Sequence, residues 1–125
     1  MNNYKNYKDL DIWNKSFSFA LMVFDLCKKI NNNSINRVLI NQIIRSVTSI
    51  AGNIAEGSGA STKKEFINYL NIARKSAIET NNWLVFIFSN NIVNKKSAVL
   101  LEEKSVEIIK ILPQLLKTLK NNYTF

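Results

Sequence analysis

The sequence contains no histidine, one cysteine, one proline and three glycines. The absence of histidine removes the commonest general base and the commonest metal ligand, together with Ser–His and Cys–His nucleophile pairs. The single Cys27 excludes an intrachain disulfide and a zinc site built from several cysteines. So few glycines and prolines also argue against a β-sandwich, which needs many tight turns. The composition therefore favours a protein that is not an enzyme and that uses no metal ion or cofactor.

What the sequence does contain is a large apolar fraction and an excess of positive charge. Its 125 residues, 46% of them hydrophobic, match the size of one domain with a buried core. Lysine and arginine number 17 against nine aspartates and glutamates, which gives a net charge of +8. Such a charge favours a polyanionic partner, RNA or DNA. The alternative is a compositional bias, since 14 of the 17 cations are lysine and 19 residues are asparagine.

No segment has the properties of a targeting signal or a membrane span. Residues 1–11 are polar and lack the apolar core of a secretory signal. The densest apolar stretch, residues 17–26, contains Ser18 and Asp25 and is far shorter than the ~20 residues that a membrane-spanning helix needs. We therefore expect a cytoplasmic protein with no membrane partner.

Hydrophobic residues recur at spacings of three and four through most of the chain, which is the period of an amphipathic helix. Polar breaks interrupt this pattern at residues 31–34, 57–59 and 90–94. Thr62 and Glu65 form a capping box, which predicts the start of a helix. The sequence thus predicts an all-α fold, an antiparallel up-down-up-down four-helix bundle. We expect a single domain over residues 1–125, with helices at about 9–30, 35–56, 63–89 and 97–120.

The first predicted helix carries more apolar surface than one position in a bundle needs. Counted at 100° per residue, its apolar arc spans roughly 220°, about twice the width of an ordinary core-facing stripe. One stripe is assigned to the core: Leu10, Trp13, Phe17, Ala20, Phe24 and Cys27. The second stripe is expected on the surface, where another copy of the chain would bury it. The predicted oligomer interface is therefore Phe19, Val23, Leu26 and Ile30.

The three arginines stand out among the cations, because a guanidinium suits phosphate recognition better than an ammonium does. Two of them lie two turns apart on one face of the second helix, and the third lies in the third helix. A Gly-Ser-Gly segment before the third helix could offer free N–H groups to a phosphate, beside two lysines. An ordinary solvated surface is the alternative for each of these groups. The predicted nucleic-acid contacts are Arg37, Arg45, Lys63, Lys64, Arg74 and Lys75.

Other polar residues are expected to be structural. Glu56 and Arg74 are predicted to form an ion pair that holds the turn between the second and third helices, since half-buried charges are usually paired. Glu56 has no second carboxylate at a spacing that suits acid–base catalysis. Cys27 lies in a core stripe, so we expect a buried thiol and not a nucleophile. No catalytic residue is predicted.

Three segments resemble a known family. The stretch from Ser46 to Gly57 reads Ser-Val-Thr-Ser-Ile-Ala-Gly-Asn-Ile-Ala-Glu-Gly, and residues 7–13 and 64–77 also match. Together they resemble the four-helix-bundle proteins encoded in intervening sequences of bacterial 23S rRNA genes, the S23-type family. The resemblance covers about residues 4–120. Many members have a proline where this chain has Ala51, which should leave the second helix straighter here.

The resemblance implies a four-helix bundle that assembles as a homopentamer. The accessory variability determinant of diversity-generating retroelements shares this fold, and for those members the resemblance also implies binding of nucleic acid and of a reverse transcriptase. Two functions follow as hypotheses. The first is a non-enzymatic protein that associates with the backbone of RNA or DNA, in an intervening-sequence or retroelement setting. The alternative is an assembly protein whose oligomer binds a protein partner such as a reverse transcriptase.

Overall fold

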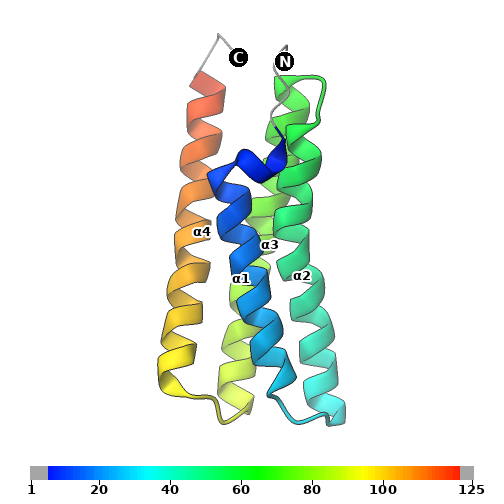
Figure 1. Cartoon of the computed structure of the whole chain (residues 1–125), viewed down its shortest axis with the longest axis vertical. Helices are drawn as coiled ribbons and strands as arrows, with labels where there is room; N and C mark the ends of the chain where they lie inside the picture. Colours follow the sequence, from blue (N-terminus) through cyan, green and yellow to red (C-terminus); the bar gives the residue numbers. More distant parts are fainter. Residues whose placement is uncertain (1–5, 122–125) are drawn as a thin grey trace.

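The computed structural model describes residues 6–121, which form four long helices packed side by side (Figure 1). A short 3-10 helix, η1 (Tyr7–Asp9), precedes α1 (Asp11–Lys28) and α2 (Ser34–Ser58). They are followed by α3 (Lys63–Asn90) and α4 (Lys95–Asn121). Each helix packs against its neighbours in sequence, and α1 also packs against α4, which closes the bundle. The predicted all-α, up-down-up-down four-helix bundle is therefore confirmed.

Asparagine and threonine side chains cap the starts of three helices. The Asn33 Oδ1 atom accepts a hydrogen bond from the backbone N–H of Asn36 at 2.8 Å, and α2 begins there. Thr62 accepts from the backbone N–H of Glu65 at 3.1 Å and caps α3 in the same way. These two starts lie within a residue of those predicted, because a cap is a local property of the sequence. At α4 the cap is Asn94, so this helix begins two residues before the predicted position.

The end of α2 differs from the prediction. The helix continues through Gly57 and Ser58, which are both buried. The backbone N–H groups of Gly59 and Ala60 bond to the carbonyls of Glu56 and Gly57. These N–H groups therefore have partners within the chain. At these two positions the Gly-Ser-Gly segment offers no free N–H group to a phosphate, which favours the alternative of an ordinary turn between helices.

Gly57 is needed for the close approach of α2 and α3. A Cβ atom on Gly57 would lie 2.9 Å from both Cδ1 of Phe66 and Cβ of Tyr69. Ordinary carbon contacts are longer, so any side chain at this position would push α3 away from α2. The glycine therefore sets the packing of the two helices and does not end the first of them.

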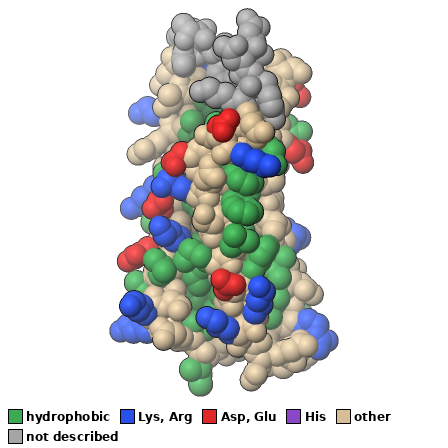
Figure 2. Space-filling model, viewed as in Figure 1, with side chains coloured by type: hydrophobic (Ala, Val, Ile, Leu, Met, Phe, Trp, Pro, Cys, Tyr) green, Lys and Arg blue, Asp and Glu red, His purple; other side chains and the backbone are tan. Residues whose placement is uncertain are grey.

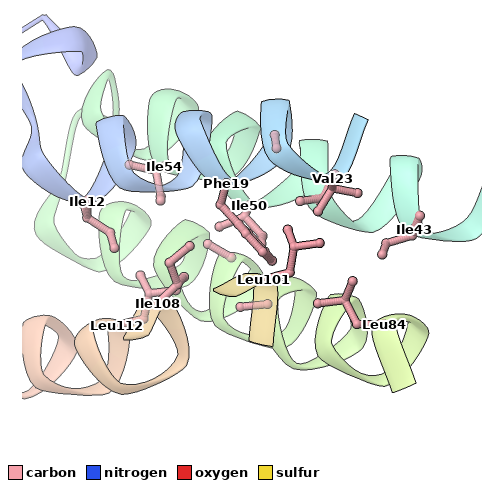
Figure 3. Close-up of a cluster of buried hydrophobic side chains, with 14 of the residues drawn as sticks. Ile12, Phe19, Val23, Ile43, Ile50, Ile54, Leu84, Leu101, Ile108 and Leu112 are labelled. Atoms are coloured by element: carbon pink, nitrogen blue, oxygen red, sulfur yellow. The ribbon is translucent and has the colours of Figure 1, made fainter. Parts of the chain in front are cut away.

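The core runs along the axis of the bundle and draws side chains from all four helices. Figure 3 shows its central part, where side chains from α1, α2, α3 and α4 converge. The largest completely buried side chains include Phe19, Ile43, Ile50, Leu84 and Leu112. A core shared by four elements explains why no pair of helices is expected to be stable alone.

Burial on α1 corrects the predicted oligomer interface. Phe19 and Val23 are 1% and 0% exposed and Leu26 is also buried, so all three belong to the core of the single chain. Ile30, the fourth predicted residue, follows the end of α1 and is half-buried against the core. The exposed side chains are instead Phe17 at 42% and Leu21 at 45%. Both apolar stripes fall within one wide arc, and the helix period alone does not say which stripe faces inward.

Hydrogen bonds between side chains join the helices to one another at several heights. Ser49 and Ser76 are 2.9 Å apart across α2 and α3, and Asn81 donates to Ser105 of α4 at 3.1 Å. At one end of the bundle, the buried Asn36 accepts from Asn90 and Asn91, each at 3.0 Å. These polar contacts allow one register between the helices, since sliding would leave buried groups without partners.

Across residues 6–121, no helix combines the length and the apolar character that crossing a membrane requires.

Candidate nucleic-acid interface

A group of positive charges lies on α3 and α4 at one end of the bundle. Residues 63–78 of α3 and residues 108–121 of α4 pack against each other, because the two helices are antiparallel. Together these segments hold seven cations and one carboxylate, Glu65, so their net charge is +6. The cations are Lys63, Lys64, Arg74, Lys75, Lys110, Lys117 and Lys120.

A shallow depression of about 510 Å³ lies between the two helices within this region. Arg74 and Asn71 line it from α3, and Lys117 and Lys120 line it from α4. Asn121, Pro113 and Leu116 complete the wall, which contains no carboxylate. We call this surface the α3–α4 depression. It brings together one guanidinium, two ammonium groups and two amides.

These groups have the chemistry that binds a phosphate backbone. A guanidinium donates two parallel hydrogen bonds to phosphate oxygens, whereas an ammonium acts as a mobile point charge. The amides of Asn71 and Asn121 can donate to phosphate or sugar oxygens. None of the charges in the depression has an ion-pair partner among residues 6–121. The surface is therefore electropositive and open to an anion.

The other predicted contacts do not join this surface. Arg45 forms an ion pair with Glu79 of α3 and donates to Gln42 at 2.9 Å, so its charge is already neutralised. Arg37 lies near the start of α2, where its Nε donates to Asn32 at 3.4 Å. The rise of a helix places Arg37 about 30 Å from the far end of α2. Of the predicted residues, Lys63, Lys64, Arg74 and Lys75 share α3, and Arg74 alone lines the depression.

Lys117 and Lys120 are not among the nucleic-acid contacts predicted from the sequence. Both lie in the last turns of α4, where a lysine is common because it suits the negative end of the helix dipole. The signal that could have found them is the antiparallel arrangement itself. In that arrangement the end of α4 lies beside the first half of α3, and both segments lack carboxylates apart from Glu65.

The predicted ion pair between Glu56 and Arg74 is wrong. Neither residue takes part in the ion pairs Lys15–Asp11, Lys15–Glu107, Lys28–Asp25 and Arg45–Glu79 of residues 6–121. Because Ser49 faces Ser76, Glu56 lies level with residue 69 of α3. Arg74 is five residues further along, or about 7 Å, and it lines the α4 side of the helix.

Two titratable groups outside the depression have shifted pKa values. Burial raises the pKa of the Cys27 thiol to about 11, so the thiol is protonated at neutral pH. The hydrogen bond from Lys15 to Glu107, at 3.1 Å, raises the pKa of that lysine and joins α1 to α4. Residues 6–121 contain no cluster of three or more His, Cys, Asp or Glu side chains that could hold a metal ion.

A second surface is apolar and runs along α1. Trp13, Phe17, Leu21 and Phe24 follow one another at spacings of four, four and three on the outer side of this helix. The rings of Trp13 and Phe17 are stacked, with centroids 4.9 Å apart and planes 12° apart. Figure 2 shows a continuous strip of hydrophobic side chains where α1 and α2 face the viewer. We call these four residues the α1 ridge.

Comparisons with known proteins agree with this architecture. A family model described as 23S rRNA-intervening sequence protein matches residues 8–114. A crystal structure from Bacteroides thetaiotaomicron, described as a protein of unknown function from the S23 ribosomal protein family, is 36% identical in sequence. The match covers 85% of this chain and 98% of that chain, with a TM-score of 0.77. The comparison with curated proteins gives no match.

Proposed function

This chain belongs to the 23S rRNA-intervening sequence protein family, and we propose that it is a non-enzymatic protein that binds the phosphate backbone of nucleic acid through the α3–α4 depression. The observation that carries the proposal is the grouping of Arg74, Lys117 and Lys120 on a wall that contains no carboxylate. An isolated surface lysine usually lies near acidic residues, as Lys15 does beside Asp11 and Glu107. Here the sorting of charge produces one electropositive face.

The mode of binding follows from the side chains that this face lacks. Proteins that bind single strands stack bases on exposed aromatic rings. In residues 63–78 and 108–121 the aromatic residues are Phe66 and Tyr69, which are buried and half-buried. The face offers cations and amides, so it recognises backbone and shape and does not read base sequence. We propose an accessory role of this kind in an rRNA intervening-sequence or retroelement setting.

The proposal is tested by measuring affinity for duplex RNA and DNA over a series of salt concentrations. Neutralising phosphates releases counterions, so the logarithm of the association constant should fall linearly with the logarithm of salt concentration. Three phosphate contacts predict a slope of about −3, since each contact contributes about −0.9. An absence of binding to either duplex even at low salt would contradict the proposed function.

The α1 ridge supports a second role, which is assembly. We propose that copies of the chain associate through Trp13, Phe17, Leu21 and Phe24 and form a homo-oligomer. Two of these side chains are more than 40% exposed, and a continuous apolar strip on a surface usually marks an interface. The family resemblance suggests five copies, and a protein partner such as a reverse transcriptase would then bind the assembled particle. Several depressions in one oligomer would also strengthen binding to a long nucleic acid through multivalency.

A further inference from the structure

The end of the bundle opposite the α3–α4 depression contains a cavity of about 390 Å³. It lies between the last turns of α1 and the first turns of α4, and the turn that joins α3 to α4 closes one side. Its apolar wall includes Leu26 and Ile30 from α1, Val93 from the turn and Leu101 from α4. A cavity of this size and composition, between helices of a bundle, is typical of a site for a small apolar ligand.

The charged groups at the mouth of this cavity are not equivalent. Asp25 lies at the mouth but forms an ion pair with Lys28, 3.8 Å away, and Lys28 does not line the cavity. Asn94 is also at the mouth, and its Oδ1 atom accepts from the backbone N–H groups of Lys96 and Ser97. Lys29 lines the cavity and takes part in none of the ion pairs of residues 6–121.

The two turns at this end add further positive charge. Residues 29–37 and 90–97 contain four cations and no carboxylate. Lys29, Ile30 and residues 31–36 line a second hollow together with Asn90, Asn91 and Ile92, so the two turns lie side by side. Figure 2 shows hydrophobic side chains gathered between α4 and α1 in the lower half of the molecule, with Lys or Arg side chains below them and Asp or Glu side chains beside them. The mouth is thus electropositive and the interior is apolar.

We propose that this cavity binds a single-chain amphipathic anion of the fatty-carboxylate type. The alkyl chain lies against Leu26, Val93 and Leu101, and the head group lies at the mouth beside Lys29. The apolar wall removes the alkyl chain of the ligand from water, which favours binding. A nucleic acid has no alkyl chain to bury there. The unpaired ammonium selects an anionic head group over a cationic one, because the charge of Asp25 is offset by Lys28.

The experiment compares decanoate with decyltrimethylammonium, which have the same alkyl chain length and opposite head-group charge. Both are titrated, below their micelle concentrations, into the full-length protein labelled at methyl groups for NMR. We expect decanoate to bind at least several times more tightly and to shift the methyl signals of Leu26, Val93 and Leu101. Equal affinity for the two detergents, no binding of decanoate, or shifts confined to the α1 ridge would overturn the proposal.

Two lysines at opposite ends of the bundle supply a matched pair of variants. Lys29→Gln should weaken decanoate binding by about fivefold, the usual scale for one partly exposed charge contact. Lys75→Gln makes the same change of net charge on α3, at the opposite end of the bundle, and should leave the affinity within about twofold. Leu100→Trp, at an exposed position that also lines the cavity, should block binding without disturbing the core. The proposal is wrong if the two glutamine variants weaken binding equally while both retain wild-type helicity.

Discussion

The hydroxyl of Thr80 donates a hydrogen bond to the Oγ atom of Ser46 at 2.9 Å, at a place where both side chains are completely buried. Thr80 belongs to α3 and Ser46 to α2, so this bond crosses the interface between the two helices. Ser46 also donates to the carbonyl of Ile43 in its own helix, and the single proton of the Thr80 hydroxyl is shared between Ser46 and the carbonyl of Ser76, 2.8 Å away. A hydroxyl pair within a mostly apolar core fixes the relative height of α2 and α3.

Replacing Thr80 by valine should destabilise the protein by about 1 to 2 kcal/mol, because the volume is kept while buried Ser46 loses a partner. Urea unfolding measures this change. Thr118→Val is the control, since the Thr118 hydroxyl is exposed and bonds only within α4; its effect should stay within about 0.5 kcal/mol. The double variant Ser46→Ala with Thr80→Val should cost less than the sum of the two single changes. Strict additivity would show that the two hydroxyls do not interact.

The two glycines of α2 should respond to alanine in opposite directions. Gly57→Ala places a methyl group 2.9 Å from Phe66 and Tyr69 and should cost about 1 to 3 kcal/mol through overpacking. Gly52→Ala meets no atom within 4 Å on the exposed side of the same helix. It should stabilise the protein by about 0.5 to 1 kcal/mol, the difference in helix propensity. Urea midpoints that move in the same direction for both variants would contradict this account of Gly57.

The buried thiol predicts a dependence of stability on alkaline pH. The pKa of Cys27 is about 11 in the folded chain against 9.0 for an ordinary thiol. Above pH 9 the unfolded chain loses the thiol proton before the folded chain does, so stability falls as the pH rises from 9 to 11. Cys27→Ala removes this contribution. Lys15 titrates in both proteins, so its effect cancels in the difference in unfolding free energy between wild type and variant. A difference that stays constant from pH 8 to 11 would contradict the burial of the thiol.

The α1 ridge predicts which substitutions dissociate the oligomer. Phe17→Lys with Leu21→Lys should convert the assembly to monomers and keep the helical content, because both side chains are exposed in the single chain. Light scattering after gel filtration measures the mass, and circular dichroism measures the helix. Ile78→Lys with Val85→Lys changes two equally exposed side chains on α3 and should leave the assembly intact. Phe19→Lys should instead unfold the chain. A monomeric wild-type protein would refute the assembly proposal.

The parts of the fold that depend on local signals could be predicted from the sequence. Asn33, Thr62 and Glu65 mark helix starts through hydrogen bonds that span three residues, so the sequence contains all the atoms involved. The repeat of apolar residues likewise identifies four helices and their antiparallel order. These local signals are sufficient to predict the all-α class.

The parts that depend on contacts between helices could not be predicted. On α1, Phe17 and Phe19 lie in the same wide apolar arc, and only packing against α2 and α4 shows that Phe19 is the core residue. The α3–α4 depression depends on the register in which Asn81 meets Ser105, which places Arg74 beside Lys117 and Lys120. Arg45 is neutralised by Glu79, 34 residues away, and no local pattern shows this pairing.

Charge reversal at either end of the bundle gives the most direct test of binding through the α3–α4 depression. The affinity of each variant for duplex RNA is measured over a series of salt concentrations. Arg74→Glu with Lys120→Glu acts in the α3–α4 depression, and Lys95→Glu with Lys96→Glu makes the same change of net charge at the start of α4. We expect the first pair to lower the affinity at least about tenfold and to reduce the slope of log affinity against log salt concentration by about two. The second pair should change the affinity little and leave that slope unchanged. Equal losses from both pairs, with equal changes of slope, would show that total charge and not the α3–α4 depression governs binding.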